Sequence, residues 1–220
     1  TQNQGAVFVL DEIVTGFKVH LPGAISKYKL NPDLTTWGKG IANGFSFCAL
    51  TGKKEIMDLG GIRQKENEKV FLISTTHGGE THAMAAALTT IKEFKKHNII
   101  SHVEKTGDLF IKYCNEKILS HKLEEYIEII PCLWQPTIIF KGLDKKISAG
   151  LRTLMLQEMI KRNVLFQGIF VISYSHKEKD IMFFIEAFDS ALTIYEKALD
   201  QGFDKFLEGE IIKPFFCKFN

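Results

Sequence analysis

The sequence has few cysteines, few arginines and no long apolar run, and these shortages exclude several classes of protein. Its four cysteines show no C-x-x-C spacing, which indicates reduced thiols rather than a disulfide framework or a zinc site. No apolar run approaches the ~18 residues of a membrane span, and no basic segment followed by an apolar stretch marks a secretory signal. We therefore expect a cytoplasmic protein without a membrane partner.

An excess of positive charge is also missing. The 28 basic and 26 acidic residues leave a formal net charge of +2, which argues against nucleic acid as a partner. The sequence lacks the G-x-x-x-x-G-K-[ST], H-E-x-x-H and G-x-S-x-G motifs, so we expect no P-loop, no metal centre and no serine hydrolase site. What it does have is 45% hydrophobic residues over 220 positions, enough for a core in one or two domains.

Apolar spacing predicts an α/β arrangement in roughly the first hundred residues and an α+β arrangement after them. Residues 1–98 and 99–220 are the expected domains. Helices are predicted at about 53–61, 80–97, 100–120, 148–162 and 177–200, and strands at 6–10, 34–37, 47–51, 70–74, 126–130, 137–140, 164–166 and 170–172. The clearest helical stripe, which we expect to be buried core, consists of Ile181, Phe184, Ile185, Phe188, Leu192, Tyr195 and Leu199.

The strand predicted at 6–10 is a continuous apolar run, as expected for a strand buried on both faces. Asp11 follows it, at the strand end where open α/β sheets bind ligands. A carboxylate there can pair with the protonated ring nitrogen of a cofactor, or it can simply cap a turn. Ile13 can likewise lie against a flat ring or belong to the core.

A second group of candidate residues lies in glycine-rich turns. Lys39 stands between two glycines, which let a ligand approach its amine, although a lysine in a surface loop has the same pattern. The segment 74–80, S-T-T-H-G-G-E, precedes a predicted helix and is typical of an anion site; the ordinary alternative is an N-cap at Thr76 or Thr81. An acid and a lysine are the groups that pyridoxal phosphate requires, one at its ring nitrogen and one at its aldehyde.

Four segments in their order resemble the class III PLP-dependent aminotransferases of fold type I, and within them the glutamate-1-semialdehyde 2,1-aminomutase-like branch. The likeness covers nearly the whole chain. It is carried by VFVLDEIVTGFKV, PDLTTWGKGIANGFSFCALTGKKEIMD, THGGETHAMAAAL and SYSHKEKDI.

The resemblance implies the C-terminal part of the family's large domain, with a mostly parallel sheet, followed by a small α+β C-terminal domain. It implies that Lys39 forms the Schiff base with the cofactor and moves the proton. Asp11 would pair with the pyridine nitrogen, Ile13 would stack on the ring, and Thr76 would contact the phosphate in the neighbouring subunit of a homodimer. The substrates would be a small amine donor and a carbonyl acceptor.

The sequence also departs from the family. Glu80 and Thr81 replace the usual Asn-Pro, and the family's N-terminal half has no counterpart. Because the strand at 6–10 follows Thr1 so closely, we expect that an N-terminal portion is missing. The alternatives to an aminotransferase or aminomutase are an inactive fragment, a partner subunit that needs a separate N-terminal chain, or a plain α/β interaction domain. None of the three arginines can be assigned to a substrate carboxylate: Arg63, Arg152 and Arg162.

Overall fold

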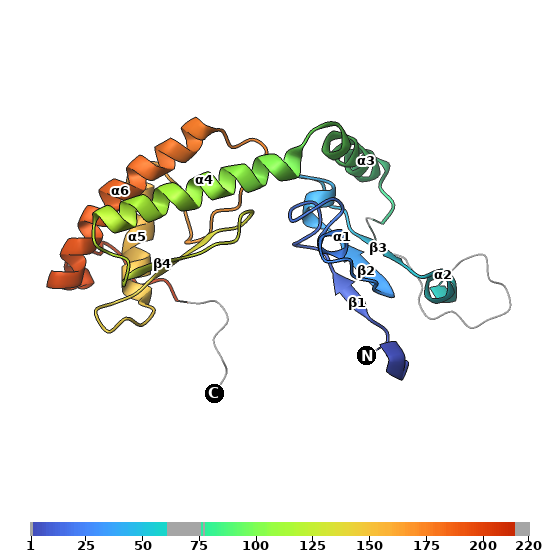
Figure 1. Ribbon diagram of the computed structural model, residues 1–220, viewed down its shortest axis with the longest axis horizontal. Helices are drawn as coiled ribbons and strands as arrows, with labels where there is room; N and C mark the ends of the chain where they lie inside the picture. The colour runs from blue at the N-terminus through green and yellow to red at the C-terminus, as the bar shows by residue number, and fades with distance from the viewer. Residues whose placement is uncertain (1, 61–75, 77, 214–220) are drawn as a thin grey trace. The chain divides into compact units, whose positions relative to one another are not determined.

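The structure, a computed structural model, describes residues 2–60, 76 and 78–213 (Figure 1). The strand predicted at 70–74 lies outside the described residues. The chain divides into two compact units, Thr1–Ile100 and Ser101–Asn220, and each is described by itself. The division lies just inside helix α4 (Ile99–Ser120).

A three-stranded sheet forms the frame of the first unit, in the order β1-β2-β3. β1 runs parallel to β2, with Asp11 opposite Thr36, and β3 is antiparallel to β2. The helix predicted at 80–97 is confirmed as α3. The elements of this unit are η1 (Gln2–Gln4), β1 (Val9–Asp11), α1 (Ala24–Lys27), β2 (Leu34–Trp37), η2 (Lys39–Ile41), β3 (Ala49–Gly52), α2 (Lys54–Met57), η3 (Asp58–Gly60) and α3 (Thr81–Lys96).

The core of the first unit lies between the sheet and α3. The Phe17 ring meets the Trp37 and Phe94 rings edge-on, at centroid distances of 6.1 and 5.6 Å. Ala87 of α3 is buried in the same cluster as Ala42, which follows the η2 turn. Small side chains allow α3 to approach this turn closely.

The expectation that residues 6–10 form a strand buried on both faces is wrong. The strand β1 begins only at Val9, and Val7 and Val9 are 53% and 50% exposed. Among the described residues, β1 pairs only with β2, so its other edge meets no described strand. A strand is buried on both faces only where other elements cover both faces of its sheet, and the local sequence does not encode those elements.

The second unit packs three helices against a β-hairpin (Figure 1). Strands β4 and β5 are antiparallel, with Ile129 opposite Ile138. Its elements are α4, β4 (Ile127–Ile130), β5 (Thr137–Phe140), α5 (Ala149–Lys161), α6 (Glu178–Gln201) and η4 (Phe203–Lys205).

The strands predicted at 164–166 and 170–172 are wrong. This segment runs beside β5 and donates the Phe170 N–H to the Pro136 carbonyl at 3.0 Å, but only Ile169 forms a β-bridge. Gly168 has a φ of +86°, and this left-handed residue interrupts the extended backbone.

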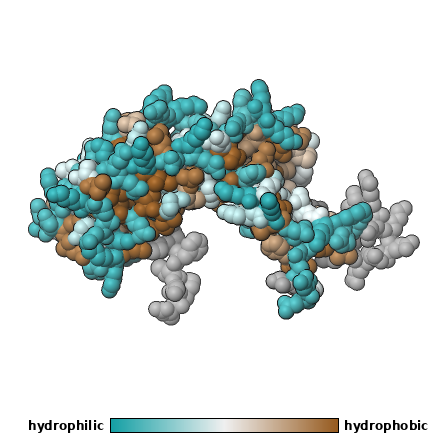
Figure 2. Space-filling model, viewed as in Figure 1, coloured by the Kyte–Doolittle hydropathy of each residue, from teal (hydrophilic) through white to brown (hydrophobic). Residues whose placement is uncertain are grey.

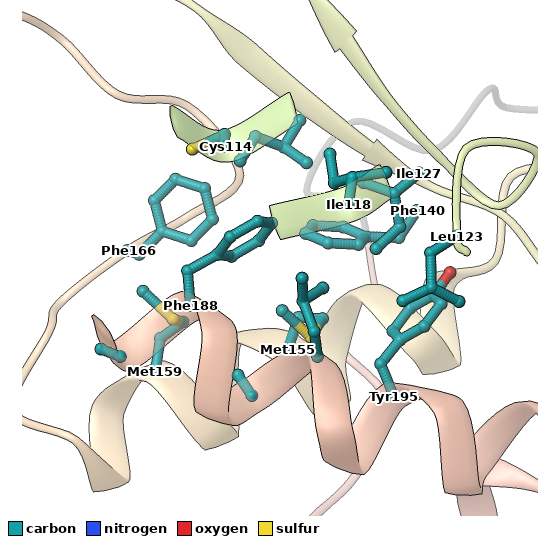
Figure 3. Packing of buried hydrophobic residues seen from close by; sticks show 14 of the residues in the cluster. Cys114, Ile118, Leu123, Ile127, Phe140, Met155, Met159, Phe166, Phe188 and Tyr195 are labelled. Carbon is teal, nitrogen blue, oxygen red and sulfur yellow. The ribbon is translucent and has the colours of Figure 1, made fainter. Parts of the chain in front are cut away.

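The apolar stripe predicted for the last long helix is confirmed. All seven of its residues lie on α6 and are buried, and they pack against α5 and the hairpin (Figure 3). The Tyr195 hydroxyl reaches through this core and donates to the Lys141 carbonyl at 2.7 Å. Burial raises the pKa of the Cys114 thiol in the same cluster, so this cysteine acts as an apolar core residue.

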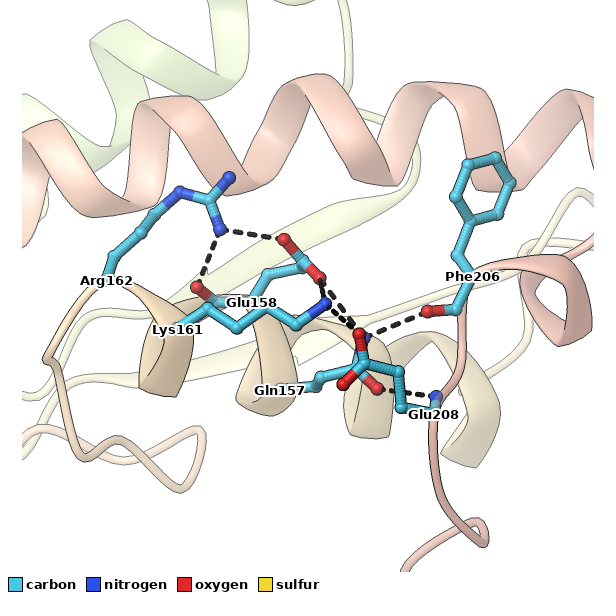
Figure 4. A network of polar contacts seen from close by, with 6 residues as sticks. All are labelled: Gln157, Glu158, Lys161, Arg162, Phe206 and Glu208. Atoms are coloured by element: carbon cyan, nitrogen blue, oxygen red, sulfur yellow. Dashed lines mark hydrogen bonds and ion pairs between the residues drawn. The ribbon is translucent and has the colours of Figure 1, made fainter.

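A polar network attaches the segment after α6 to α5 (Figure 4). Gln157 donates to the Phe206 carbonyl at 2.9 Å and accepts from the Glu208 N–H at 2.9 Å. Burial alone would raise the pKa of Glu158, but hydrogen bonds from Arg162, Gln157 and Lys161 lower it overall. The buried carboxylate is therefore charged and fully paired.

Hydrophilic residues cover much of the visible surface of both units, with apolar side chains between them (Figure 2). Among the described residues of the second unit, the most exposed large apolar side chain is that of Leu165, at 85%. Within the described part of the chain, no helix has the length and apolar character needed to cross a membrane.

Asp33, immediately before β2, joins the starts of β1 and β2 to the end of the antiparallel β3. Its carboxylate accepts from the Phe8 N–H at 2.7 Å and pairs with the Lys53 ammonium at 2.6 Å. Its carbonyl accepts from the Lys53 N–H at 2.9 Å. The hydrogen bonds from Lys53 and Phe8 lower the pKa of Asp33 to about 2.

We predict that Asp33→Asn lowers the free energy of unfolding at neutral pH, and that this effect disappears in acid. The folded-state pKa lies below the value of about 4 for an unfolded Asp, so the ionised carboxylate stabilises the fold above about pH 4. The contribution is lost as the pH falls from about 4 through about 2. Urea unfolding of both proteins across this range measures it.

The matched control is Asp58→Asn, which removes an exposed pair with Lys54 and should change stability little at any pH. A stability loss for Asp33→Asn that stayed constant from neutral pH down to about pH 2 would contradict the prediction.

Candidate active site

Two of the predicted site residues lie at the same edge of the first sheet. Asp11 is the last residue of β1, and Lys39 begins η2, two residues after Trp37 ends β2. Because β1 and β2 are parallel, their carboxyl ends meet at one edge, where open α/β sheets bind ligands. The parallel register therefore brings an acid and an amine to the same region.

The Asp11 carboxylate is exposed and held in orientation. Its Oδ1 atom accepts hydrogen bonds from the Ile13 N–H at 2.8 Å and from the Thr36 hydroxyl at 3.1 Å. Both described bonds use one oxygen, which leaves Oδ2 for an N–H or cationic partner. The sequence alone does not indicate Thr36 as a site residue, because only the strand register places it opposite Asp11.

Lys39 is exposed and has a φ of +47°. Its turn lies against the turn that follows Asp11: a Cβ placed on Gly38 would be 3.4 Å from the Ile13 side chain. Ile13 is half-buried there, next to the glycine that precedes the lysine. An apolar side chain therefore lies close to both the carboxylate and the lysine turn.

Glu12 is the fully buried residue that fixes this arrangement. Its carboxylate accepts from the Ala24 N–H at 3.0 Å, from the Ile25 N–H at 2.5 Å and from the Thr15 hydroxyl. All of these partners are internal, so Glu12 supports the turn and is not available to a ligand. A Cβ on Gly16 would lie 2.6 Å from the Glu12 carbonyl, which explains the glycine. The sequence alone does not indicate the role of Glu12, because its backbone partners Ala24 and Ile25 lie 12 and 13 residues further along the chain.

Thr76 is exposed in a turn, and no described contact joins it to the other three predicted residues. Ser74, Thr75 and His77 of the predicted anion segment lie outside the described residues. The N-cap of α3 is Glu80, whose carboxylate is 3.3 Å from the His82 ring, so neither Thr76 nor Thr81 is the cap. The predicted phosphate contact by Thr76 stays a prediction.

The described residues fit a planar cofactor at this edge. An oriented carboxylate oxygen suits a protonated ring nitrogen, an apolar side chain suits a ring face, and an exposed primary amine suits a carbonyl carbon. Ile13 is the described link between the two turns, since its N–H donates to Asp11 and its side chain lies against Gly38.

Comparison with known proteins gives consistent matches. Residues 1–133 match the family described as aminotransferase class-III. The chain is 31% identical to the 3-aminobutyryl-CoA aminotransferase of Cloacimonas acidaminovorans, over 88% of this chain and 45% of that protein. It is 28% identical to the glutamate-1-semialdehyde 2,1-aminomutase of Nitrosopumilus maritimus, over 87% of this chain and 47% of that protein.

Solved structures show the same fold. The FumI protein of Sphingopyxis sp. MTA144, in its PLP internal aldimine form, superposes with a TM-score of 0.79 at 20% identity, over 91% of this chain and 46% of that one. An omega-transaminase from Sphaerobacter thermophilus gives a TM-score of 0.75 at 17% identity, over 89% of this chain and 46% of that one. The chain therefore has the α/β architecture of these transaminases and spans about half the length of the proteins it matches.

We predict that Glu12→Gln lowers the free energy of unfolding by about 1–3 kcal/mol. The amide would place an NH2 group where an oxygen now accepts from the Ala24 or Ile25 N–H. Urea unfolding measures the loss. Glu55→Gln, at an exposed position on α2, is the matched control and should be nearly neutral. Equal stability of the two variants would show that the Glu12 bonds do not hold this turn.

Proposed function

Because this chain belongs to the class-III aminotransferases, we propose that it carries out amino-group transfer with pyridoxal phosphate as cofactor. The proposed substrates are a small-molecule amine donor and an aldehyde or ketone acceptor. Intermolecular transamination and an intramolecular transfer like that of the aminomutases both belong to this proposal. The observation that carries it is the joint position of Asp11 and Lys39 at the carboxyl ends of parallel strands.

Asp11 has the role of electrostatic partner to the ring nitrogen. The Ile13 N–H and the Thr36 hydroxyl hold its Oδ1 atom, so the carboxylate keeps its direction without a ligand. A preorganised carboxylate keeps the ring nitrogen protonated at low reorganisation cost. When bound, pyridoxal phosphate supplies the electron sink for charge that develops at the substrate Cα.

Lys39 has two roles, binding and proton transfer. Its Nζ atom would hold the cofactor at the aldehyde carbon, and the neutral amine is the form suited to this role. The same Nζ atom would move the proton at the substrate Cα, as a base and then as an acid. The exposed side chain in the glycine-flanked turn has the freedom that both roles require.

The remaining assignments are proposals from the family. Ile13 would contact the face of the ring, and Thr76 would contact the phosphate bound in the neighbouring subunit. This role of Thr76 implies a homodimer with shared active sites. We also propose a cytoplasmic location for the protein. The alternative is a chain that is inactive by itself or acts as a partner subunit, since it spans about 45% of the length of its curated relatives.

We predict that Lys39→Ala lowers the rate of multiple-turnover transamination by about 10³-fold or more, because the proposal assigns both the bond to the cofactor and the proton transfer to Lys39. The measurement is steady-state amino transfer by the chain with added pyridoxal phosphate, an amine donor and a semialdehyde acceptor. Lys92→Ala, an exposed lysine on α3, is the control and should keep the wild-type rate.

Retained activity in Lys39→Ala would refute the assignment. Turnover by the wild-type chain alone would exclude the inactive fragment and the dependent subunit. If the wild-type chain turned over only after a second polypeptide was added, the partner-subunit alternative would be correct.

A further inference from the structure

A histidine closes the turn at residues 173–176, which leads from the extended segment beside β5 into helix α6. The turn belongs to the second unit, whereas the candidate active site lies in the first. The His176 N–H donates to the Ser173 carbonyl at 3.2 Å. In return, the Ser173 N–H donates to the His176 ring, at 3.1 Å from Nδ1. One of these two described bonds therefore depends on a side chain that can take up a proton.

The direction of the bond from Ser173 fixes the state of the His176 ring. A backbone N–H can only donate, so Nδ1 must accept with its lone pair, and the hydrogen of the neutral ring lies on Nε2. The charged ring carries a hydrogen on both nitrogens and cannot accept this bond. The Ser173 hydroxyl lies farther from Nδ1, at 3.5 Å. The bond from the Ser173 N–H therefore exists only while the ring is neutral.

His176 also connects the turn to α4. The His102 ring, in the first turn of α4, donates from Nε2 to the His176 carbonyl at 3.0 Å. The His176 ring packs on the Phe170 ring at a centroid distance of 5.0 Å. Phe170 stacks in turn on the buried ring of Phe110, which belongs to α4, at 4.4 Å. Both the backbone and the ring of His176 are thus linked to this helix.

The ionisable side chains around this turn come from α6, from α4 and from the turn itself. They are Asp180, Lys177, His102 and Tyr174. Asp180 already accepts from the Lys177 N–H at 2.8 Å, and the Lys177 ammonium donates to the Tyr174 carbonyl at 3.3 Å. The segment 131–136, which pairs with residues 170–172, has no charged side chain.

The surroundings of the His176 ring favour its neutral form. Burial lowers the pKa of this half-buried ring; the negative charge of Asp180 opposes that effect, and His102 adds to it. A histidine in an unfolded chain has a pKa of about 6.5. As the pH falls below this value, the open turn takes up a proton more readily than the closed turn, so acid favours opening. Above about pH 7 both forms are neutral, and the bond from Ser173 contributes in full.

We propose that His176 is an acid-sensitive latch, which closes the turn before α6 and attaches it to α4 while the ring is neutral. Protonation at Nδ1 releases the Ser173 N–H and frees the turn to move away from His102. The released bonds lie at the start of both long helices, whose buried faces belong to one core cluster that stays packed. This inference concerns the second unit and does not depend on the cofactor.

Amide hydrogen exchange of the full chain between about pH 7 and about pH 5 tests the inference, with mass spectrometry of short peptides to resolve the turn. We expect the protection of the Ser173 amide, corrected for the intrinsic exchange rate, to fall by roughly fivefold, the equivalent of about one hydrogen bond. His176→Asn should keep its protection, because the amide oxygen can accept the same bond and does not titrate. The control is His20→Asn, at an exposed histidine, which should follow the wild-type profile.

A second measurement, on the wild-type chain, keeps the test decisive if His176→Asn folds poorly. Carbon-13 NMR of the histidine rings reports the tautomer and the protonation of each ring. We expect the Nε2–H tautomer for His176, and protonation at a lower pH in the folded chain than in the chain unfolded in urea. The inference would be overturned by the Nδ1–H tautomer, by equal protonation of the folded and unfolded chains, or by an equal loss of protection in a folded His176→Asn protein.

Discussion

The parallel pairing of β1 with β2 is the constraint on which the candidate site depends. It sets Asp11 opposite Thr36 and brings both strand ends to one edge of the sheet. A slip of one residue would turn the Asp11 side chain to the other face and remove its bond from the Thr36 hydroxyl. The buried Glu12 carboxylate then fixes the following turn, and this turn supports the glycines around Lys39.

Two adjacent acids at the end of one strand have different tasks because their surroundings differ. Glu12 is fully buried, and each of its described hydrogen bonds comes from a donor of its own turn or of α1, so it contributes rigidity. Asp11 is exposed, with one oxygen held by the protein. The buried Glu12 carboxylate thus holds in place the turn beside Asp11, whose exposed carboxylate can contact a ligand.

The features that were predicted correctly from the sequence are those that depend on the spacing of residues close together in the chain. The stripe of α6 and the helix α3 follow from residue spacing alone, and both are present. The prediction that residues 6–10 are buried on both faces of the sheet was wrong. Such burial depends on which elements cover each face, and the spacing of apolar residues does not reveal this. The importance of Glu12 and Thr36 was missed because their partners lie 12 to 25 residues away along the chain. The motif identified Asp11 and Lys39, but only the parallel register explains why both lie at one edge of the sheet, and their chemical roles stay predictions.

The most direct measurement of the central claim is borohydride reduction of the purified chain in the presence of pyridoxal phosphate, followed by peptide mass spectrometry. Reduction converts the imine of a bound cofactor into a stable amine, so it records which lysine holds the cofactor. A pyridoxyl group confined to Lys39 is the expected result. A chain without label, or with label spread over surface lysines, would contradict the claim that the two turns at the ends of β1 and β2 form a cofactor site.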